Sequence, residues 1–280
     1  MFTAQKYVKV ESLNEAWQLN QRRSCRILGG MQWMKMSNST FGTVIDLSGL
    51  GLDKITETDD GWEIGCMVTL RMLEQCEPLE AYTNGALKEA LRHIVGVQFR
   101  NMATIGGTVA GKFGFSDVLT VLLVMDTDVE LHHRGTTPLG EYLKLPYDND
   151  IVKGVTIHRA RVPQRFAYRS MRNTETDLPT ITCASVTDGH SIRIAVGARP
   201  QVAVTYGEDI PEKIRLICHD QKTAGTEKSE IGDFAAEFAA RVADEIPVGS
   251  NLRGSADYRK HLITVLTKRN VQELLCGRQD

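Results

Sequence analysis

The apolar positions in the first part of the chain predict short elements of both kinds. Between residues 11 and 20 they recur at near-helical spacing, which predicts a helix. Residues 26–28 are a short apolar run ending at Gly29-Gly30, a pattern typical of a buried strand that enters a turn. Two further strands are predicted at residues 44–47 and 62–64. The pattern therefore predicts a small mixed lobe, which we place at residues 1–55.

A longer, glycine-containing region follows, and its pattern changes to helices flanked by strands. The predicted helices cover residues 69–75, 84–93 and 116–125. The predicted strands cover residues 129–132 and 152–158. Between the second and third helices lies a glycine-dense stretch with Gly96, Gly106, Gly107, Gly111 and Gly114. We predict a second lobe over residues 56–162.

The last part of the chain begins after Pro163 and reads as strands followed by helices. The predicted strands cover residues 166–169, 182–186 and 191–195, and the last two are joined as a hairpin across Asp188-Gly189. The predicted helices cover residues 234–246 and 255–275. Residues 163–280 are thus expected to form a third, α+β lobe.

Composition narrows the class of protein. The chain has 280 residues, with 33 basic and 35 acidic side chains and no basic run that would track a phosphate backbone or anionic lipid. Nucleic acid and membranes are therefore not expected as partners. Residues 1–25 contain no continuous apolar stretch, so neither a signal peptide nor a spanning helix is predicted, and a cytoplasmic location is expected.

Cysteine and histidine spacing gives no metal site. The six cysteines are widely separated and include no Cys-x-x-Cys pair, so free, mostly buried thiols are expected. His132-His133 is the one histidine doublet, but neighbouring side chains on a strand point to opposite faces. We predict no metal ligands on this chain.

Two glycine pairs are candidates for ligand binding. In Thr104-Ile105-Gly106-Gly107-Thr108, the glycines allow close backbone approach and the flanking hydroxyls can bond phosphate or ribose oxygens. Gly29-Gly30 has a similar setting, and an ordinary turn remains the alternative for both. Two such loops are what a long ligand with a central diphosphate would need. The usual nucleotide-binding glycine motifs and the Gly-x-Ser-x-Gly elbow are absent from the sequence, which favours chemistry carried by a cofactor.

Four stretches, spread over nearly the whole chain, carry a family resemblance. They are Leu28-Gly29-Gly30, Ile64-Gly65-Cys66-Met67-Val68-Thr69, Arg100-Asn101 through Thr108, and Leu252-Arg253-Gly254-Ser255-Ala256-Asp257-Tyr258-Arg259. In this order and at these separations, they resemble the FAD-binding medium subunit of the molybdenum hydroxylases, the group of xanthine dehydrogenase and carbon monoxide dehydrogenase.

The resemblance implies an α+β fold and a set of FAD contacts. Two FAD-binding lobes of the vanillyl-alcohol-oxidase (PCMH) type would hold an extended FAD, beside a C-terminal α+β lobe with a three-stranded sheet and helices. The family's diphosphate loops correspond to Leu28, Gly29, Gly30, Met31, Gln32 and Trp33, and to Thr104, Ile105, Gly106, Gly107 and Thr108. Asp117 is implied to hold the adenosine ribose, Ile151 to line the flavin, and Arg169 to lie near the isoalloxazine.

Residue chemistry leaves alternatives for these three positions. A carboxylate suits ribose hydroxyls, but Asp117 at a predicted helix start also reads as a capping acid. A cation beside the flavin would stabilise the anionic reduced ring, and Arg169 is either that cation or a solvated strand residue. Ile151, taken without the resemblance, reads as a core residue.

The chain also departs from the family pattern. Met31 and Gln32 stand where the family usually has Thr-Asp, so the first loop lacks a hydroxyl and a carboxylate but keeps its backbone N–H groups. Thr108 replaces a usual Asn, and Arg169 replaces a frequent Lys. These changes bear on FAD affinity rather than on the fold.

The function implied is that of the flavoprotein subunit of a xanthine dehydrogenase-like enzyme. Electrons would come from a molybdopterin-containing large subunit through [2Fe-2S] clusters on a small subunit, and would leave through FAD to NAD⁺ or another acceptor. No side chain of this chain is expected to act as a catalytic acid or base. The alternatives are a structural subunit of the same complex with weak FAD binding, or a stand-alone flavin oxidoreductase.

Overall fold

The computed structural model describes residues 2–219 and 225–277, and the chain divides into two compact units. The first unit contains the chain up to Leu73, Gly96–Lys112 and Asp126–Arg159. The second contains Glu74–Val95, Phe113–Met125 and the chain from Ala160 onward. The division into lobes 1–55, 56–162 and 163–280 stays a prediction. The first and third sheets each fall within one of these ranges, whereas the second sheet begins at Ile55, the last residue of the first range.

The first unit begins with a parallel three-stranded sheet of order β1-β3-β2. Its elements are β1 (Thr3–Lys9), α1 (Leu13–Asn20), β2 (Cys25–Leu28), the 3₁₀ helix η1 (Met34–Met36) and β3 (Thr40–Asp46). Helix α1 begins where Ser12 accepts a hydrogen bond from the Glu15 N–H at 3.1 Å, which satisfies a backbone donor of the first turn. Strand β2 ends at Leu28, so Gly29 emerges at the end of a parallel strand.

The second sheet of this unit is antiparallel, with order β4-β5-β8-β6-β7. Its strands are β4 (Ile55–Thr58), β5 (Gly61–Gly65), β6 (Thr127–Leu131), β7 (Gly135–Pro138) and β8 (Val152–His158). The helices of the unit besides α1 are α2 (Leu70–Glu74), α5 (Val97–Arg100), α6 (Ile105–Gly111) and α8 (Leu139–Tyr142). Helix α6 packs against β8, the central strand, and this contact places the second glycine pair over the sheet.

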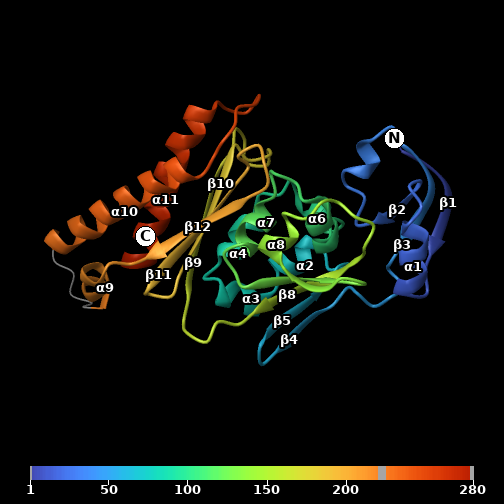
Figure 1. The fold of residues 1–280 in the computed structure, drawn as a ribbon, viewed down its shortest axis with the longest axis horizontal. Coiled ribbons are helices and arrows are strands. Elements are labelled where there is room, and N and C mark those ends of the chain that lie inside the picture. Colours follow the sequence, from blue (N-terminus) through green and yellow to red (C-terminus); the bar gives the residue numbers. More distant parts are fainter. Residues whose placement is uncertain (1, 220–224, 278–280) are drawn as a thin grey trace. The chain divides into compact units, whose positions relative to one another are not determined.

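The second unit is built on an antiparallel sheet of order β12-β11-β10-β9, seen in yellow and orange in Figure 1. Its strands are β9 (Arg165–Met171), β10 (Ile181–Thr187), β11 (Ser191–Gly197) and β12 (Val204–Asp209). Its helices are α3 (Glu77–Tyr82), α4 (Ala86–Arg92), α7 (Asp117–Leu122), α9 (Glu212–His219), α10 (Gly225–Glu245) and α11 (Ala256–Cys276). The predicted hairpin at Asp188-Gly189 is confirmed: it joins β10 to β11, with Gly189 at φ +86°.

This sheet has four strands rather than the three that the family resemblance implied. The fourth, β12, alternates half-buried and exposed positions at the sheet edge. Its sequence, VTYGED, has few apolar residues and contains a glycine, so it lacks the pattern of a buried strand. The mixed α and β class is nevertheless confirmed.

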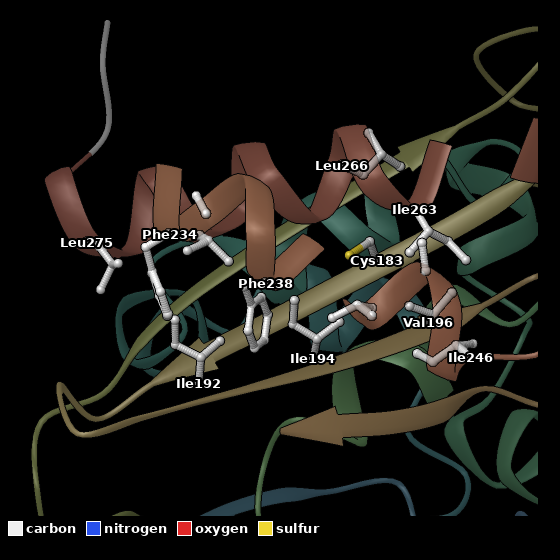
Figure 2. Close-up of a cluster of buried hydrophobic side chains, with 14 of the residues drawn as sticks. Cys183, Ile192, Ile194, Val196, Phe234, Phe238, Ile246, Ile263, Leu266 and Leu275 are labelled. Carbon is white, nitrogen blue, oxygen red and sulfur yellow. The ribbon is translucent and has the colours of Figure 1, made fainter. Parts of the chain in front are cut away.

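Helices cover both faces of the four-stranded sheet. On β10, Thr182 bonds Thr120 of α7 at 2.9 Å, while the neighbouring Cys183 contacts Thr267 of α11 at 3.6 Å. Successive side chains on a strand point to opposite faces, so α7 and α11 lie on opposite sides. Figure 2 shows the α11 side, where Phe234 and Phe238 of α10 meet apolar residues of β11. This core anchors both long helices.

The cysteines and the helices add two further facts. All six cysteines are free thiols; Cys25, Cys66 and Cys183 are buried, and Cys276 is exposed. In the described part of the chain, no helix has both the length and the apolar character needed to cross a membrane.

Candidate functional site

The first glycine loop follows β2 and can be formed only by glycine at position 30. Gly30 has φ +78°, and a methyl group on its Cα would overlap the carbonyl oxygen of Met102. Met31, the next residue, also lies in the left-handed region, at φ +59°. A non-glycine residue with positive φ is uncommon and is often found where a backbone binds a ligand. The loop is thus held in a specific, unfavourable conformation.

This loop presents backbone donors. The N–H groups of Gly30, Met31 and Gln32 donate no hydrogen bond to any residue within 2–219 and 225–277. Backbone N–H groups need a partner, and an anion such as a diphosphate supplies several acceptors at once. The Gln32 side chain is buried and its Nε2 donates to the Gly30 carbonyl at 3.1 Å. The Gln32 side chain therefore stabilises the loop through this hydrogen bond. The aspartate that the family usually has at this position would place a carboxylate there instead.

The second glycine pair lies in the first turn of α6. Thr104 precedes the helix, and its Oγ1 accepts a hydrogen bond from the Gly107 N–H at 3.1 Å. The Gly106 N–H donates to the Cys66 carbonyl at 2.9 Å, and a methyl on Gly106 would come within 2.5 Å of Cys66 Cβ. The third matched stretch thus packs directly on the second, Ile64–Thr69.

The two glycine loops meet each other within the first unit. A methyl group on Gly29 would lie 2.9 Å from Gly107 Cα, and one on Gly107 would lie 2.6 Å from the Gly29 carbonyl oxygen. Any side chain at either position would separate the loops. We call Leu28–Trp33 and Thr104–Thr108 together the glycine cradle. It contains N–H groups and threonine hydroxyls but no acidic side chain, so it fits an anionic diphosphate.

In the second unit, Asp117 starts α7 as its first residue and is buried. The N-cap residue of α7 is Ser116, whose Oγ accepts a hydrogen bond from the Leu119 N–H at 3.1 Å. The Asp117 Oδ1 accepts hydrogen bonds from the Tyr168 hydroxyl and from the Arg172 guanidinium. Burial raises the pKa of the Asp117 carboxyl, and Arg172 and Tyr168 oppose that rise. The carboxylate is therefore not the ordinary capping acid of the alternative reading.

Arg169 lies on the other face of the same sheet. In the β9–β10 register Tyr168 pairs with Ala184, and Arg169 pairs with Cys183 on the α11 side. Its guanidinium donates to Asn270 at 2.7 Å and forms an ion pair with Glu273 at 2.7 Å, both on α11. The structure thus brings Arg169 to α11 and not to Asp117.

Ile151 lies in the first unit, just before β8, and is 1% exposed. Its carbonyl accepts a hydrogen bond from the His132 N–H at 2.9 Å. This setting is that of a core residue. A contact between Ile151 and a flavin stays a prediction, as do the roles implied for Asp117 and Arg169.

Comparison with known proteins decides the family. Residues 2–165, more than half of the chain, match the family described as the FAD binding domain in molybdopterin dehydrogenase. The chain belongs to this family. It is an FAD-binding subunit of the molybdenum hydroxylase family, part of an oxidoreductase complex, and its cofactor is FAD.

Relatives align with this FAD-binding subunit over most of its length. The xanthine dehydrogenase FAD-binding subunit of Escherichia coli O157:H7 is 27% identical, covering 86% of this chain and 84% of the relative. The nicotine 6-hydroxylase medium subunit of Paenarthrobacter nicotinovorans is also 27% identical, covering 96% of each. In structure, a chain of quinoline 2-oxidoreductase from Pseudomonas putida 86 superposes with a TM-score of 0.78 at 17% identity, covering 99% of both chains.

Tyr168 and Arg172 hold Asp117, and neither residue is singled out by a motif or spacing in the sequence. The sequence did offer an indication for Tyr168, because it precedes Arg169 on a predicted strand. Successive side chains on a strand point to opposite faces, so Tyr168 and Arg169 face different helix layers. Arg172 follows the end of β9 and had no periodic signal. The fourth matched stretch also has a structural role in this FAD-binding subunit: buried Arg259 donates to the carbonyls of Thr180 and Gly249 at 2.9 and 2.7 Å.

Proposed function

We propose that the glycine cradle binds the diphosphate of FAD. The observation that carries the proposal is the contact of Gly29 with Gly107 beside three consecutive N–H groups without a partner in the described residues. Backbone donors arranged in this way bind an anion without needing a cationic side chain. Met31 and Gln32 preserve these donors, so the departures from the family pattern leave the phosphate-binding groups in place.

The other contacts are proposed with different support. Asp117 offers a carboxylate for the ribose, and it is held in place by two side chains. Arg169 is proposed near the isoalloxazine on the strength of the resemblance. Its ion pair with Glu273 leaves the pair close to neutral, which would reduce its effect on a reduced flavin. Ile151 is proposed as an apolar neighbour of the flavin on the same ground.

We further propose that this chain passes electrons from [2Fe-2S] clusters of a small partner subunit to NAD⁺. The support is its family and the alignment with a xanthine dehydrogenase FAD-binding subunit over most of both chains. Bound FAD supplies the ability to accept electrons singly and to release two as a hydride. The residues of this chain bind and orient the cofactor, and the molybdenum chemistry belongs to a large partner subunit.

The test is reduction of the purified, FAD-loaded full chain under anaerobic conditions. Adding NADH should bleach the visible flavin band, because hydride transfer between FAD and the nicotinamide is reversible. Dithionite serves as the control that shows the flavin is reducible. Bleaching by dithionite but not by NADH would show that NAD⁺ is not the electron acceptor, while the proposed FAD binding would still hold. A chain that takes up no FAD would instead support the structural-subunit alternative.

A further inference from the structure

The Asp117 carboxylate is held on one side only. Arg172 and Tyr168 both donate to Oδ1, whereas Oδ2 accepts no hydrogen bond from any other residue that the structure describes. The side chains of Asp117 and Arg172 are each 6% exposed, so water screens their ion pair little. One oxygen of a fixed, buried carboxylate is thus left for another donor. We call Asp117, Tyr168 and Arg172 the Asp117 triad.

Arg172 is itself fixed from its far side. Its Nη1 donates to the Asp177 carbonyl at 2.7 Å. The Asp177 carboxylate accepts from Arg253 Nη2 at 3.1 Å and from the Leu178 N–H at 2.7 Å. Arg253 belongs to the fourth stretch that resembles the family, Leu252–Arg259. A continuous set of contacts therefore runs from that stretch through Asp177 and Arg172 to Asp117.

The charge of Arg172 decides the form in which Asp117 exists. Burial disfavours the ionised carboxylate, and a buried acid without a cation would take up a proton. A protonated carboxyl donates one hydrogen bond and is a poorer acceptor for a pair of hydroxyls. The adjacent guanidinium favours the ionised form through charge and hydrogen bonding. Removing it would leave Asp117 in place but change its chemistry.

We propose that Arg172 is a positioning residue that fixes Asp117 and keeps it ionised, so that Oδ2 accepts hydrogen bonds from the ribose hydroxyls of FAD. The inference rests on the proposed role of Asp117 in FAD binding. It assigns a function to Arg172, and through Asp177 and Arg253 a supporting function to the C-terminal stretch. Tyr168 contributes the second hydrogen bond to Oδ1.

The test compares FAD with FMN, which lacks the adenosine ribose, by flavin fluorescence titration of the full chain across the pH range in which it stays folded. Arg172→Met should weaken FAD binding by about tenfold or more at neutral pH and leave FMN binding unchanged. Its FAD affinity should recover as pH rises through the raised pKa of Asp117. Arg172→Lys keeps the charge and should lose only a few-fold, with the wild-type pH profile.

Two further variants separate the outcomes. Arg269→Met removes an exposed arginine of α11 and should match the wild type with both flavins. Arg169→Met removes the arginine on the α11 face, and any contact it makes to the isoalloxazine would affect FAD and FMN alike. Wild-type FAD affinity in Arg172→Met, or equal losses for FAD and FMN without a pH shift, would overturn the inference. Failure of the wild type to bind FAD would instead count against the proposed function.

Discussion

The glycine cradle of the first unit and the Asp117 triad of the second differ in the groups that they present to a ligand. The cradle presents backbone N–H groups, carries no formal charge, and depends on the absence of side chains at Gly29, Gly30 and Gly107. The triad presents a carboxylate oxygen and depends on three side chains and on an ion pair. One region is suited to an anion and the other to hydroxyl donors.

This difference predicts different sensitivities. Backbone N–H groups do not titrate, so pH should barely affect the cradle, but a single added methyl group should disrupt it. The triad should tolerate a substitution that keeps the size of a side chain, but loss of one charge alters the protonation of Asp117. An added side chain should therefore disrupt the glycine cradle, and the loss of a charge should disrupt the Asp117 triad.

The largest effect is expected from Gly30→Ala. The added methyl overlaps the Met102 carbonyl, and the residue must also hold φ +78°, so the loop has to move. We expect the FAD dissociation constant of the full chain to rise more than about tenfold, together with a lower melting temperature.

Gly51→Ala is the matched control for that change. Gly51 also has positive φ, +67°, but nothing lies within 4 Å of an added methyl. It should cost about 1 kcal/mol of stability for the backbone conformation and leave FAD affinity unchanged. Equal FAD affinity in the two variants would mean that the close approach at Gly30 has no bearing on the cofactor.

An effect of a different kind, without the loss of stability, is expected from Asp117→Asn. The amide keeps the size of the carboxylate but loses its charge, and a hydrogen bond to a charged group contributes about 1.5–3 kcal/mol. FAD affinity at neutral pH should fall about tenfold to a hundredfold, and its fall on acidification should disappear. A pH profile identical to that of the wild type would show that Asp117 does not set it.

The smallest effects are expected from substitutions of the two N-cap residues, Thr104 in the cradle and Ser116 beside the triad. Thr104→Val in the cradle and Ser116→Ala before Asp117 each remove an N-cap hydrogen bond and should each cost about 1 kcal/mol in denaturant unfolding. Thr104→Val should also weaken FAD binding a few-fold, because its hydroxyl fixes the Gly107 N–H. Ser116→Ala should not, since Tyr168 and Arg172 hold the carboxylate. Equal changes in FAD affinity would contradict this distinction.

Much of the cradle was predictable from sequence, because it is made of local patterns. Gly29-Gly30 follows a short apolar strand, and Gly106-Gly107 stands between hydroxyl residues. The helical conformation of Ile105–Gly111 was not predicted, since its three glycines lower the helix propensity and mask the helical period. The polar edge strands β1, β4, β7 and β12 were missed for a related reason: they lack the apolar runs of inner strands.

The triad was not predictable in the same way. Arg172 lies 55 residues from Asp117, and Tyr168 lies 51 residues away, so their meeting depends on the packing of α7 against the sheet. Sequence resemblance indicated Arg169 as the important cation, and strand alternation in the structure places that residue on the opposite face, beside Glu273. Side-chain sites assembled over long separations need the fold before they can be identified.

The central claim is that the backbone of the glycine cradle binds the FAD diphosphate, and a crystal structure of the full chain with FAD tests it most directly. We predict diphosphate oxygens about 3 Å from the backbone nitrogens of Gly30, Met31 and Gln32. A diphosphate bound elsewhere, with those three N–H groups bonded to water or protein, would contradict it.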